Sequence, residues 1–255
     1  MNTKSLFYHK NIWIIGASDG IGKAVAIALS NLGANLIISA RSEEKLVEIN
    51  HGFKNKAAVV AFDVSQREAF SVAAHSIFAT QEINSILYFP GFYEPVALSH
   101  LNNQTIDNSI DINLRSVFTL LQCTLPYLKE HSTCQLAVAA SVAGYQGLPN
   151  AQPYSATKAA VINLMESLKA EYPTYNIKLI NPGFVKTRLT AKNNFDMPAL
   201  ISTERAAKYI LAGLLKNNFE IHFPKKFTYI LKMIRMIPYK YYFLLINKYF
   251  NPLKK

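Results

Sequence analysis

Short apolar runs alternate with longer stretches of helical periodicity along most of the chain. Almost every position in the short runs is apolar, which is typical of strands that are covered by protein on both faces. The predicted strands are 11–15, 35–39, 57–62, 84–89, 135–140, 176–180 and 219–223. The helices predicted between them are 21–32, 43–49, 66–79, 105–130, 154–171 and 203–216.

This alternation predicts the fold class. Strands joined by helices form right-handed βαβ units and therefore a parallel sheet. We predict an α/β protein with a single doubly wound Rossmann-type domain over residues 1–224, a sheet of about seven strands, and a helical C-terminal extension over residues 225–255. A chain of 255 residues is long enough to bury such a core. Ligands of these sheets bind at the carboxyl ends of the strands.

The cysteines and histidines of the sequence predict neither disulfide bonds nor a metal site. Cys123 and Cys134 do not form a disulfide framework, and we expect both to be buried as small apolar residues of a protein in a reducing compartment. No cluster has the spacing of a metal site, so no metal is expected. The N-terminal apolar run is broken by Gly16, too early for a signal peptide, and no stretch reaches the roughly 18 apolar residues of a membrane span. A cytoplasmic location follows as the expectation.

A glycine-rich turn follows the first predicted strand. Gly16 permits a tight turn, Gly20 lets the backbone approach a diphosphate, and Gly22 lets the next helix pack on the strand. The helix N-terminus offers N–H groups and partial positive charge to phosphates. The turn predicts a dinucleotide site, with a ligand-free glycine turn as the alternative. Its sequence is Gly16-Ala17-Ser18-Asp19-Gly20-Ile21-Gly22.

The end of the second strand bears on the choice of cofactor. An NAD(H) site usually has an acidic residue here for the ribose hydroxyls, whereas this chain has Arg41. A guanidinium matches a 2′-phosphate in charge and geometry, so we predict that NADP(H) is preferred over NAD(H). The alternative is a solvated Arg41 paired with Glu43 or Glu44, and the carboxylate of Asp19 would oppose a nearby phosphate.

Two residues after the third strand are placed to meet the adenine ring. They are Asp63 and Val64. Asp63 also fits an ordinary helix N-cap, and the two roles are compatible.

Tyr154 and Lys158 are candidates for proton transfer. Residues four apart on a helix share one face, so both side chains can reach one pocket. A phenol titrates near ~10, but the Lys158 cation and an oxidised nicotinamide ring favour the phenolate. Tyr154 would then exchange a proton with a substrate oxygen near neutral pH. Ser141, which follows the fifth strand, would hydrogen-bond the same oxygen.

With these features in place, the chain resembles a classical short-chain dehydrogenase/reductase from about residue 11 to residue 224. The matching stretches are the glycine turn, Asp111-Ile112-Asn113-Leu114, Ala140-Ser141-Val142-Ala143-Gly144, Tyr154-Ser155-Ala156-Thr157-Lys158 and Asn181-Pro182-Gly183-Phe184-Val185-Lys186-Thr187. Each motif is modest alone, and the set is specific.

The resemblance implies a role for each matching residue. Tyr154 would be the general acid/base, Lys158 would lower its pKa and hold the nicotinamide ribose, and Ser141 would polarise the carbonyl. Asn113 would bend its helix and complete a proton relay by holding a water. The residues lining the nicotinamide and its phosphates would be Pro182, Gly183, Val185 and Thr187. A solvated Asn113 and a generic Pro-Gly turn are the alternatives.

Two departures from the family pattern concern strand bracing. The usual Asn-Asn-Ala-Gly run after the fourth strand is Tyr88-Phe89-Pro90-Gly91 here. Gly91 still allows the backbone to approach the ribose, while two aromatic residues replace the bracing asparagines. The threonine that often precedes the glycine turn is Ile15.

The predicted function is an NADP(H)-dependent oxidoreductase that interconverts a carbonyl and an alcohol. A non-catalytic nucleotide-sensing or scaffold protein on the same fold is the alternative. The candidate substrate pocket is apolar, which predicts a mostly uncharged, small-molecule or lipid-like substrate. Its expected lining is Phe92, Tyr93, Tyr145, Leu148, Leu189, Phe195, Met197, Pro198 and Leu200. We also expect a homo-oligomer, either a dimer or a tetramer.

Residues 225–255 carry most of the excess charge. The chain has a net charge of +11, and this segment contains eight basic and no acidic residues. Thr228, Lys232 and Arg235 share one helical face of segment 227–237, apolar residues fill the rest, and Pro238 ends it. Segment 239–250 continues the aromatic and basic pattern. Contact with the inner membrane surface and packing on the domain or across a homodimer both remain open, and nucleic acid is the least favoured partner.

Overall fold

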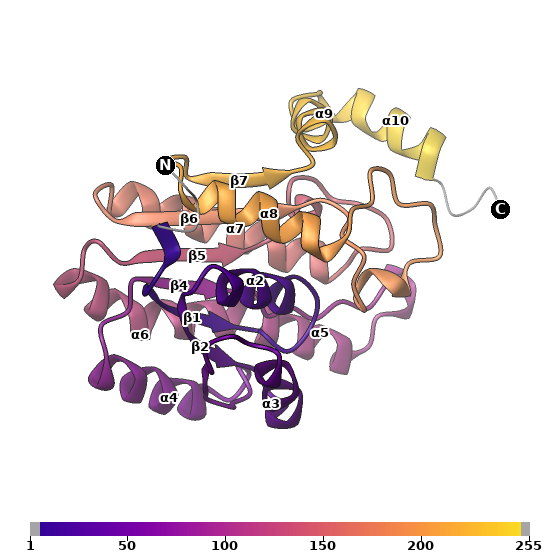
Figure 1. Cartoon of the computed structure of the whole chain (residues 1–255). Coiled ribbons are helices and arrows are strands. Elements are labelled where there is room, and N and C mark those ends of the chain that lie inside the picture. Colours follow the sequence, from indigo (N-terminus) through magenta and orange to yellow (C-terminus); the bar gives the residue numbers. More distant parts are fainter. Residues whose placement is uncertain (1–5, 251–255) are drawn as a thin grey trace.

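The computed structural model describes residues 6–250, with side chains to residue 247, and contains a seven-stranded sheet in which all neighbouring strands are parallel (Figure 1). The strand order is β3-β2-β1-β4-β5-β6-β7. The strands are β1 (Asn11–Ile15), β2 (Asn35–Ser39), β3 (Ala58–Val59), β4 (Ser85–Tyr88), β5 (Gln135–Ala139), β6 (Asn176–Pro182) and β7 (Glu220–Phe223). The predicted doubly wound fold is confirmed.

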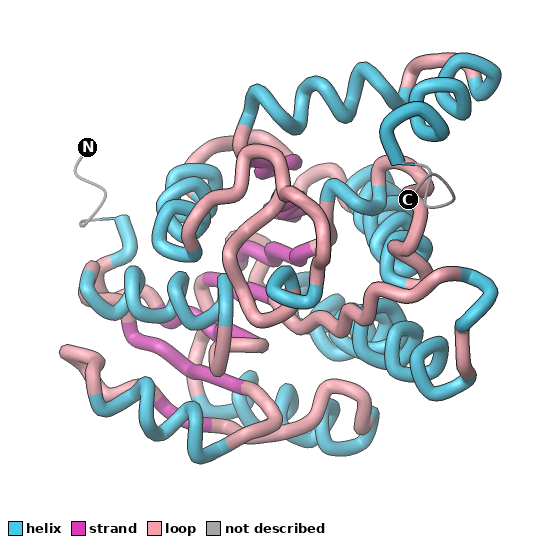
Figure 2. The backbone as a smooth tube through the Cα atoms, turned by 90° about the vertical axis from the view of Figure 1, so that its right-hand side faces the viewer, coloured by secondary structure: helices cyan, strands magenta, loops and turns pink. Residues whose placement is uncertain are grey.

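Helices cover both faces of the sheet, as Figure 2 shows. One layer consists of α2 (Gly20–Asn31), α3 (Glu43–His51) and α8 (Thr203–Leu214). The other consists of α4 (Arg67–Thr80), α6 (Ser116–Glu130) and α7 (Tyr154–Glu171). Alternate residues of β1 supply the two cores, because Ile12 and Ile14 pack in the first and Trp13 and Ile15 in the second. This two-sided burial explains why the strands contain almost only apolar residues.

Two predicted elements differ from the observed ones. The strand predicted over 57–62 pairs as β3 only at Ala58–Val59, because β3 is an edge strand with a single neighbour, β2. The helix predicted over 105–130 is divided into α5 (Asn103–Ile110), one π-helical turn over Asp111–Arg115, and α6. A π turn inserts an extra residue into the helical repeat, which helical periodicity does not reveal.

The C-terminal extension forms two further helices, α9 (Lys225–Arg235) and α10 (Tyr239–Phe250), on either side of Pro238. Figure 1 shows them beyond β7, at the outer edge of the molecule. Across residues 6–250, no helix is both long enough and apolar enough to span a bilayer. Cys123 and Cys134 are free and buried, as predicted.

Candidate active site

The glycine turn between β1 and α2 leaves no room for side chains at two positions. Gly16 has a φ of +84°, and a Cβ there would lie 2.9 Å from the backbone nitrogen of Pro90. A Cβ at Gly22 would lie 2.1 Å from the carbonyl oxygen of Gly16. Ser18 and Ile21 are half-buried in the same turn, and the first turn of α2 carries no acidic residue. The turn therefore presents bare backbone and a helix N-terminus, which suit a dinucleotide diphosphate.

Charged residues beside this turn pair with one another. Asp19 caps α2 by accepting from the Gly20 backbone N–H at 2.7 Å, and its other oxygen lies 3.1 Å from Nε of Arg188. Arg188 therefore offsets the negative charge that would oppose a nearby phosphate. Sequence reasoning did not single out Arg188, because nothing local to residue 19 indicates a partner so far along the chain.

Arg41 lies at the carboxyl end of β2 and is 79% exposed. Its guanidinium lies 3.8 Å from the carboxylate of Asp63, so the partner is Asp63, whereas the sequence suggested Glu43 or Glu44. Asp63 also accepts hydrogen bonds from the backbone and hydroxyl of Ser65. Val64 is half-buried beside it. The structure thus brings the predicted adenine-side residues next to Arg41.

The segment after β6 lies over the glycine turn. Pro182 ends β6, and the Gly183 N–H donates to the carbonyl of Phe223 at 2.7 Å. Val185 is buried and bridges to Ile201. Cγ2 of Thr187 lies 3.3 Å from where a Gly20 Cβ would stand. Among the residues predicted to line the nicotinamide and its phosphates, Thr187 therefore lies against the glycine turn.

Ser141, Tyr154 and Lys158 meet at the carboxyl end of β5. Ser141 follows this strand, Tyr154 begins α7, and Lys158 comes one helical turn later. Lys158 Nζ lies 5.8 Å from the Tyr154 ring centre and donates to the Ala139 carbonyl at 3.0 Å. Lys158 is 3% exposed, and that carbonyl is its one hydrogen-bond partner among the described residues. Its remaining donors suit the hydroxyls of a ribose.

Burial sets the protonation of the Tyr154–Lys158 pair. It raises the pKa of Tyr154 above its ordinary value, and a hydrogen bond with Ser141 offsets only part of this rise. Burial also lowers the pKa of Lys158 to about 8. The sequence argument expected Lys158 to lower the Tyr154 pKa, but in the protein alone desolvation dominates this pKa and the opposing effect comes from Ser141. A neutral phenol is the form that can donate a proton.

The buried ammonium of Lys158 makes stability depend on pH. An unfolded chain restores the ordinary pKa of 10.5, so between about pH 8 and 10.5 the unfolded state binds more protons. The contribution of Lys158 to the free energy of unfolding should therefore rise with pH across this window. Lys158→Met should be more stable than the parent below pH 8 by up to about 3 kcal/mol, and this difference should shrink towards pH 10.5. Urea unfolding of the nucleotide-free protein measures it. A constant difference, or an equal effect of the exposed Lys129→Met, would contradict the prediction.

Asn113 lies within the π turn and is fully buried. Its Oδ1 accepts from the Phe92 N–H at 2.7 Å, and its Nδ2 donates to the Phe92 carbonyl at 2.9 Å and to Thr157 Oγ1 at 3.1 Å. The π turn thus aims Asn113 at the loop after β4 and ties this loop to α7. Gly91, the preceding residue, would place a Cβ 4.0 Å from Lys158 Nζ, so this backbone runs close to the catalytic candidates.

Tyr88 and Phe89, which replace the usual asparagines at the end of β4, connect this strand to its neighbours by hydrogen bonds. The Tyr88 hydroxyl donates to Ser116 Oγ at 2.6 Å, and Ser116 donates to the Ile112 carbonyl at 2.6 Å. The hydroxyl of Tyr88 therefore links β4 to the π turn. Ile15 is buried in the core, and the Phe89 N–H donates to its carbonyl at 2.9 Å.

Two loops meet over Tyr154. The Tyr93 ring packs edge-on against Tyr154 with centroids 5.1 Å apart, and its hydroxyl donates to Asn193 at 2.7 Å. Lys192 forms an ion pair with Glu94. These contacts join the loop after β4 to the loop after β6. Sequence reasoning missed Glu94, Lys192 and Asn193, because polar loop residues far apart in sequence carry no local signal of pairing.

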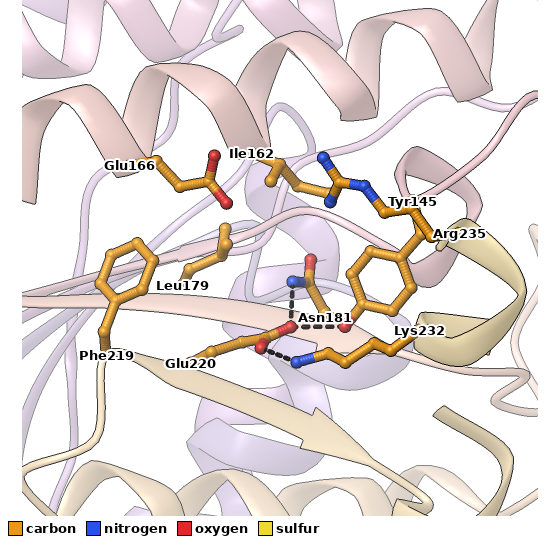
Figure 3. Close-up of a pocket in the computed structure, with 9 residues that line it drawn as sticks. All are labelled: Tyr145, Ile162, Glu166, Leu179, Asn181, Phe219, Glu220, Lys232 and Arg235. Carbon is orange, nitrogen blue, oxygen red and sulfur yellow. Dashed lines mark hydrogen bonds and ion pairs between the residues drawn. The ribbon is translucent and has the colours of Figure 1, made fainter. Parts of the chain in front are cut away.

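Tyr145 does not belong to the substrate pocket as predicted. Its hydroxyl donates to Glu220, and it lines a cavity of about 200 Å³ under α9 that Figure 3 shows. Burial raises the pKa of Glu220, but the hydrogen bonds from its neighbours outweigh burial and leave this pKa below its ordinary value. None of the four predicted catalytic residues lines the cavity. The cavity is therefore separate from the predicted catalytic residues.

Comparison with known proteins identifies the family. The short chain dehydrogenase family model matches residues 10–198, most of the chain. The chain belongs to this family. Such a dehydrogenase is an oxidoreductase that uses a nicotinamide dinucleotide to interconvert a carbonyl and an alcohol. The family that the sequence resembled is thereby confirmed.

Individual relatives agree with this assignment. An uncharacterized oxidoreductase of Staphylococcus epidermidis is 29% identical over 204 residues, covering 79% of this chain and 89% of the relative. The 3-oxoacyl-[acyl-carrier-protein] reductase FabG of Rickettsia prowazekii is 30% identical over 187 residues, covering 72% and 76%. A Sphingobium yanoikuyae short-chain dehydrogenase, solved with NADPH, has the same fold with a TM-score of 0.76 at 18% identity, covering 90% of this chain and 96% of that one.

Proposed function

We propose that this dehydrogenase interconverts a carbonyl and an alcohol on an apolar substrate, with Tyr154 as general acid/base. One observation carries the proposal: the Tyr154 phenol, the Ser141 hydroxyl and the buried Lys158 ammonium converge at the carboxyl end of β5. Bound NADPH would supply the hydride. Ser141 would orient the substrate oxygen and Tyr154 would donate the proton to it. Lys158 would hold the ribose and stabilise the resulting phenolate.

Asn113 has a positioning role in this proposal. It holds both backbone polar groups of Phe92 and also reaches α7 through Thr157. The loop that covers Tyr154 is thereby kept in register with the helix that carries Tyr154 and Lys158. The sequence further implied a water-mediated proton relay through Asn113, and its place beside Gly91 and Lys158 is compatible with one.

The apolar substrate class follows from the residues around Tyr154. Tyr93 packs against the phenol, Phe195 packs edge-on against Phe184, and Lys192 is neutralised by Glu94. A substrate that enters between these loops meets mainly rings and methylene groups. NADPH oxidation with a panel of apolar ketones and aldehydes tests the proposal. If NADPH binds and no carbonyl compound is reduced, the non-catalytic nucleotide-sensing alternative replaces it.

The preference for NADP(H) over NAD(H) rests on Arg41. Its exposed guanidinium is free to leave Asp63 for a 2′-phosphate, with a geometry that matches phosphate oxygens. We expect Arg41→Ser to raise the KM for NADPH by about 10- to 100-fold and to leave the KM for NADH unchanged. Steady-state kinetics with both cofactors measures this. Arg205→Ser, at an exposed arginine of α8, should change neither value. A parent enzyme that favours NADH would overturn the preference.

A further inference from the structure

Helix α9 docks on the domain through a face that contains polar side chains. Thr228 is fully buried, and its hydroxyl lies 2.6 Å from Nδ1 of His222 in β7. Lys232 forms an ion pair with Glu220, which also accepts hydrogen bonds from Tyr145 and Asn181, as Figure 3 shows. Phe227 and Leu231 pack against the core beside these polar groups, so the inward face of α9 contains both polar and apolar side chains.

The opposite sides of α9 and α10 are apolar and exposed. Met236 is 78% exposed and Tyr239 is 71% exposed. Eight of the seventeen exposed large apolar side chains fall within this short segment, so exposed apolar side chains are concentrated on these two helices, and we call the eight the patch. They are Tyr229, Ile230, Met233, Met236, Tyr239, Tyr241, Phe243 and Leu244.

Basic residues accompany the patch, and acidic residues do not. Lys225, Lys226, Arg235 and Lys240 are all exposed, while Lys232 is paired with Glu220. No aspartate or glutamate follows Glu220 in the sequence. Aromatic and aliphatic side chains with a cationic edge form the surface that a helix presents to a membrane interface.

We propose that α9 and α10 form a docking surface for an anionic lipid bilayer, on which the protein lies without crossing it. Charge favours lipid over a second copy of the chain. A two-fold interface would place this basic patch against itself, and like charges oppose such pairing. The remainder of the sequence carries a net charge of +3, so on balance it does not attract the basic segment of another copy. Anionic headgroups supply the complementary charge.

Helices α9 and α10 adjoin one of the two loops that cover Tyr154, the loop after β6, and the segment after β5. The Phe227 ring of α9 lies 5.7 Å from the Phe184 ring, which packs on Phe195. The Tyr242 hydroxyl of α10 donates to the Gly147 carbonyl, in the segment that leads to Tyr154. If the apolar substrate class proposed above holds, docking brings the substrate loops close to the phase where such a substrate accumulates.

Vesicle sedimentation with the full chain tests the docking surface independently of catalysis. The protein should sediment with vesicles that contain phosphatidylglycerol, and far less with pure phosphatidylcholine vesicles. Ile230→Glu combined with Met233→Glu should weaken binding by about tenfold or more, because it places charge in the patch. Lys226→Ala combined with Lys240→Ala should weaken binding to the anionic vesicles alone. Val72→Glu, at an exposed apolar residue of α4, is the matched control and should bind as the parent does.

Three results would overturn the proposal. The parent protein could fail to sediment with the anionic vesicles. Val72→Glu could lose as much binding as the double glutamate variant. The protein could form a dimer that the double glutamate variant dissociates, which would assign the patch to a second copy. Circular dichroism and Tyr154-dependent NADPH oxidation show whether each variant is folded, so a loss of membrane binding is separable from failure of the proposed reaction.

Discussion

Replacing Tyr154 with phenylalanine will lower kcat for carbonyl reduction by about 10²–10⁴-fold. The substitution removes one oxygen and leaves the ring that packs against Tyr93. Burial raises the pKa of Tyr154, so its phenol remains protonated and available as the proton donor. Without this donor, the alkoxide formed by hydride transfer has no nearby acid. NADPH oxidation under saturating substrate measures the loss, and cofactor fluorescence should show that NADPH binding is retained.

Tyr93→Phe is the matched control for this variant. Tyr93 touches the same ring, but burial raises its pKa to about 12 and its hydroxyl is engaged by Asn193. Loss of the Tyr93 hydroxyl should weaken the contact between the loop after β4 and the loop after β6, and should leave kcat largely unchanged. If Tyr154→Phe keeps parental kcat, or if Tyr93→Phe is equally damaged, proton donation by Tyr154 is excluded.

Gly22→Ala is expected to abolish tight nucleotide binding. Its methyl group would lie 2.1 Å from the Gly16 carbonyl oxygen, a backbone atom that cannot rotate away. Relief of this clash requires the start of α2 to move away from β1, which displaces the N–H groups that face the diphosphate. A displacement on the order of 1 Å costs about 10²-fold in a positioned site, so the Kd for NADPH should rise at least that much. Titration of cofactor fluorescence measures it.

Gly147→Ala provides the control for Gly22→Ala. A Cβ at Gly147 meets no atom within 4 Å, so the same chemical change is made without a clash. The control variant should bind NADPH as the parent does. Normal nucleotide binding by Gly22→Ala would show that the glycine turn does not hold the diphosphate.

Local patterns were sufficient to predict the sheet and the centre of the candidate site. Apolar runs mark strands that are buried on both faces, and the four-residue spacing of Tyr154 and Lys158 places both on one face of α7. The glycine turn was equally recognisable, because each glycine stands where the local backbone requires a residue without a side chain. The positions of these residues depend on short-range geometry, which the sequence displays directly.

Contacts between distant segments could not be predicted in the same way. Arg41 pairs with Asp63 although two glutamates lie closer in sequence, and Tyr145 turns to Glu220 although an apolar pocket was expected for it. The partner of each side chain depends on which distant residues the folded sheet brings next to it. The π turn around Asn113 is another example, because one inserted residue changes the helix repeat without changing its apolar pattern.

The sequence indicated an amphipathic α9 but not the side that faces the domain. Thr228 and Lys232 lie on one face of the helix whichever side of it contacts the domain. Their partners His222 and Glu220 are in β7, and only the fold places that strand beneath the helix. Packing on the domain therefore accounts for the inward sides of both helices, where Thr228, Tyr242 and Ile246 are buried, and it leaves their other sides exposed.

The Glu220–Lys232 pair selects one rotational setting of α9 about its own axis. Rolling the helix about this axis would carry Lys232 away from the partly buried Glu220 carboxylate and leave that carboxylate without its cation, which is unfavourable. The same rotation would separate Thr228 from His222 and Phe227 from Phe184. An ion pair, a hydrogen bond and an aromatic contact therefore agree on one orientation, and it leaves Met233 and Met236 in solvent.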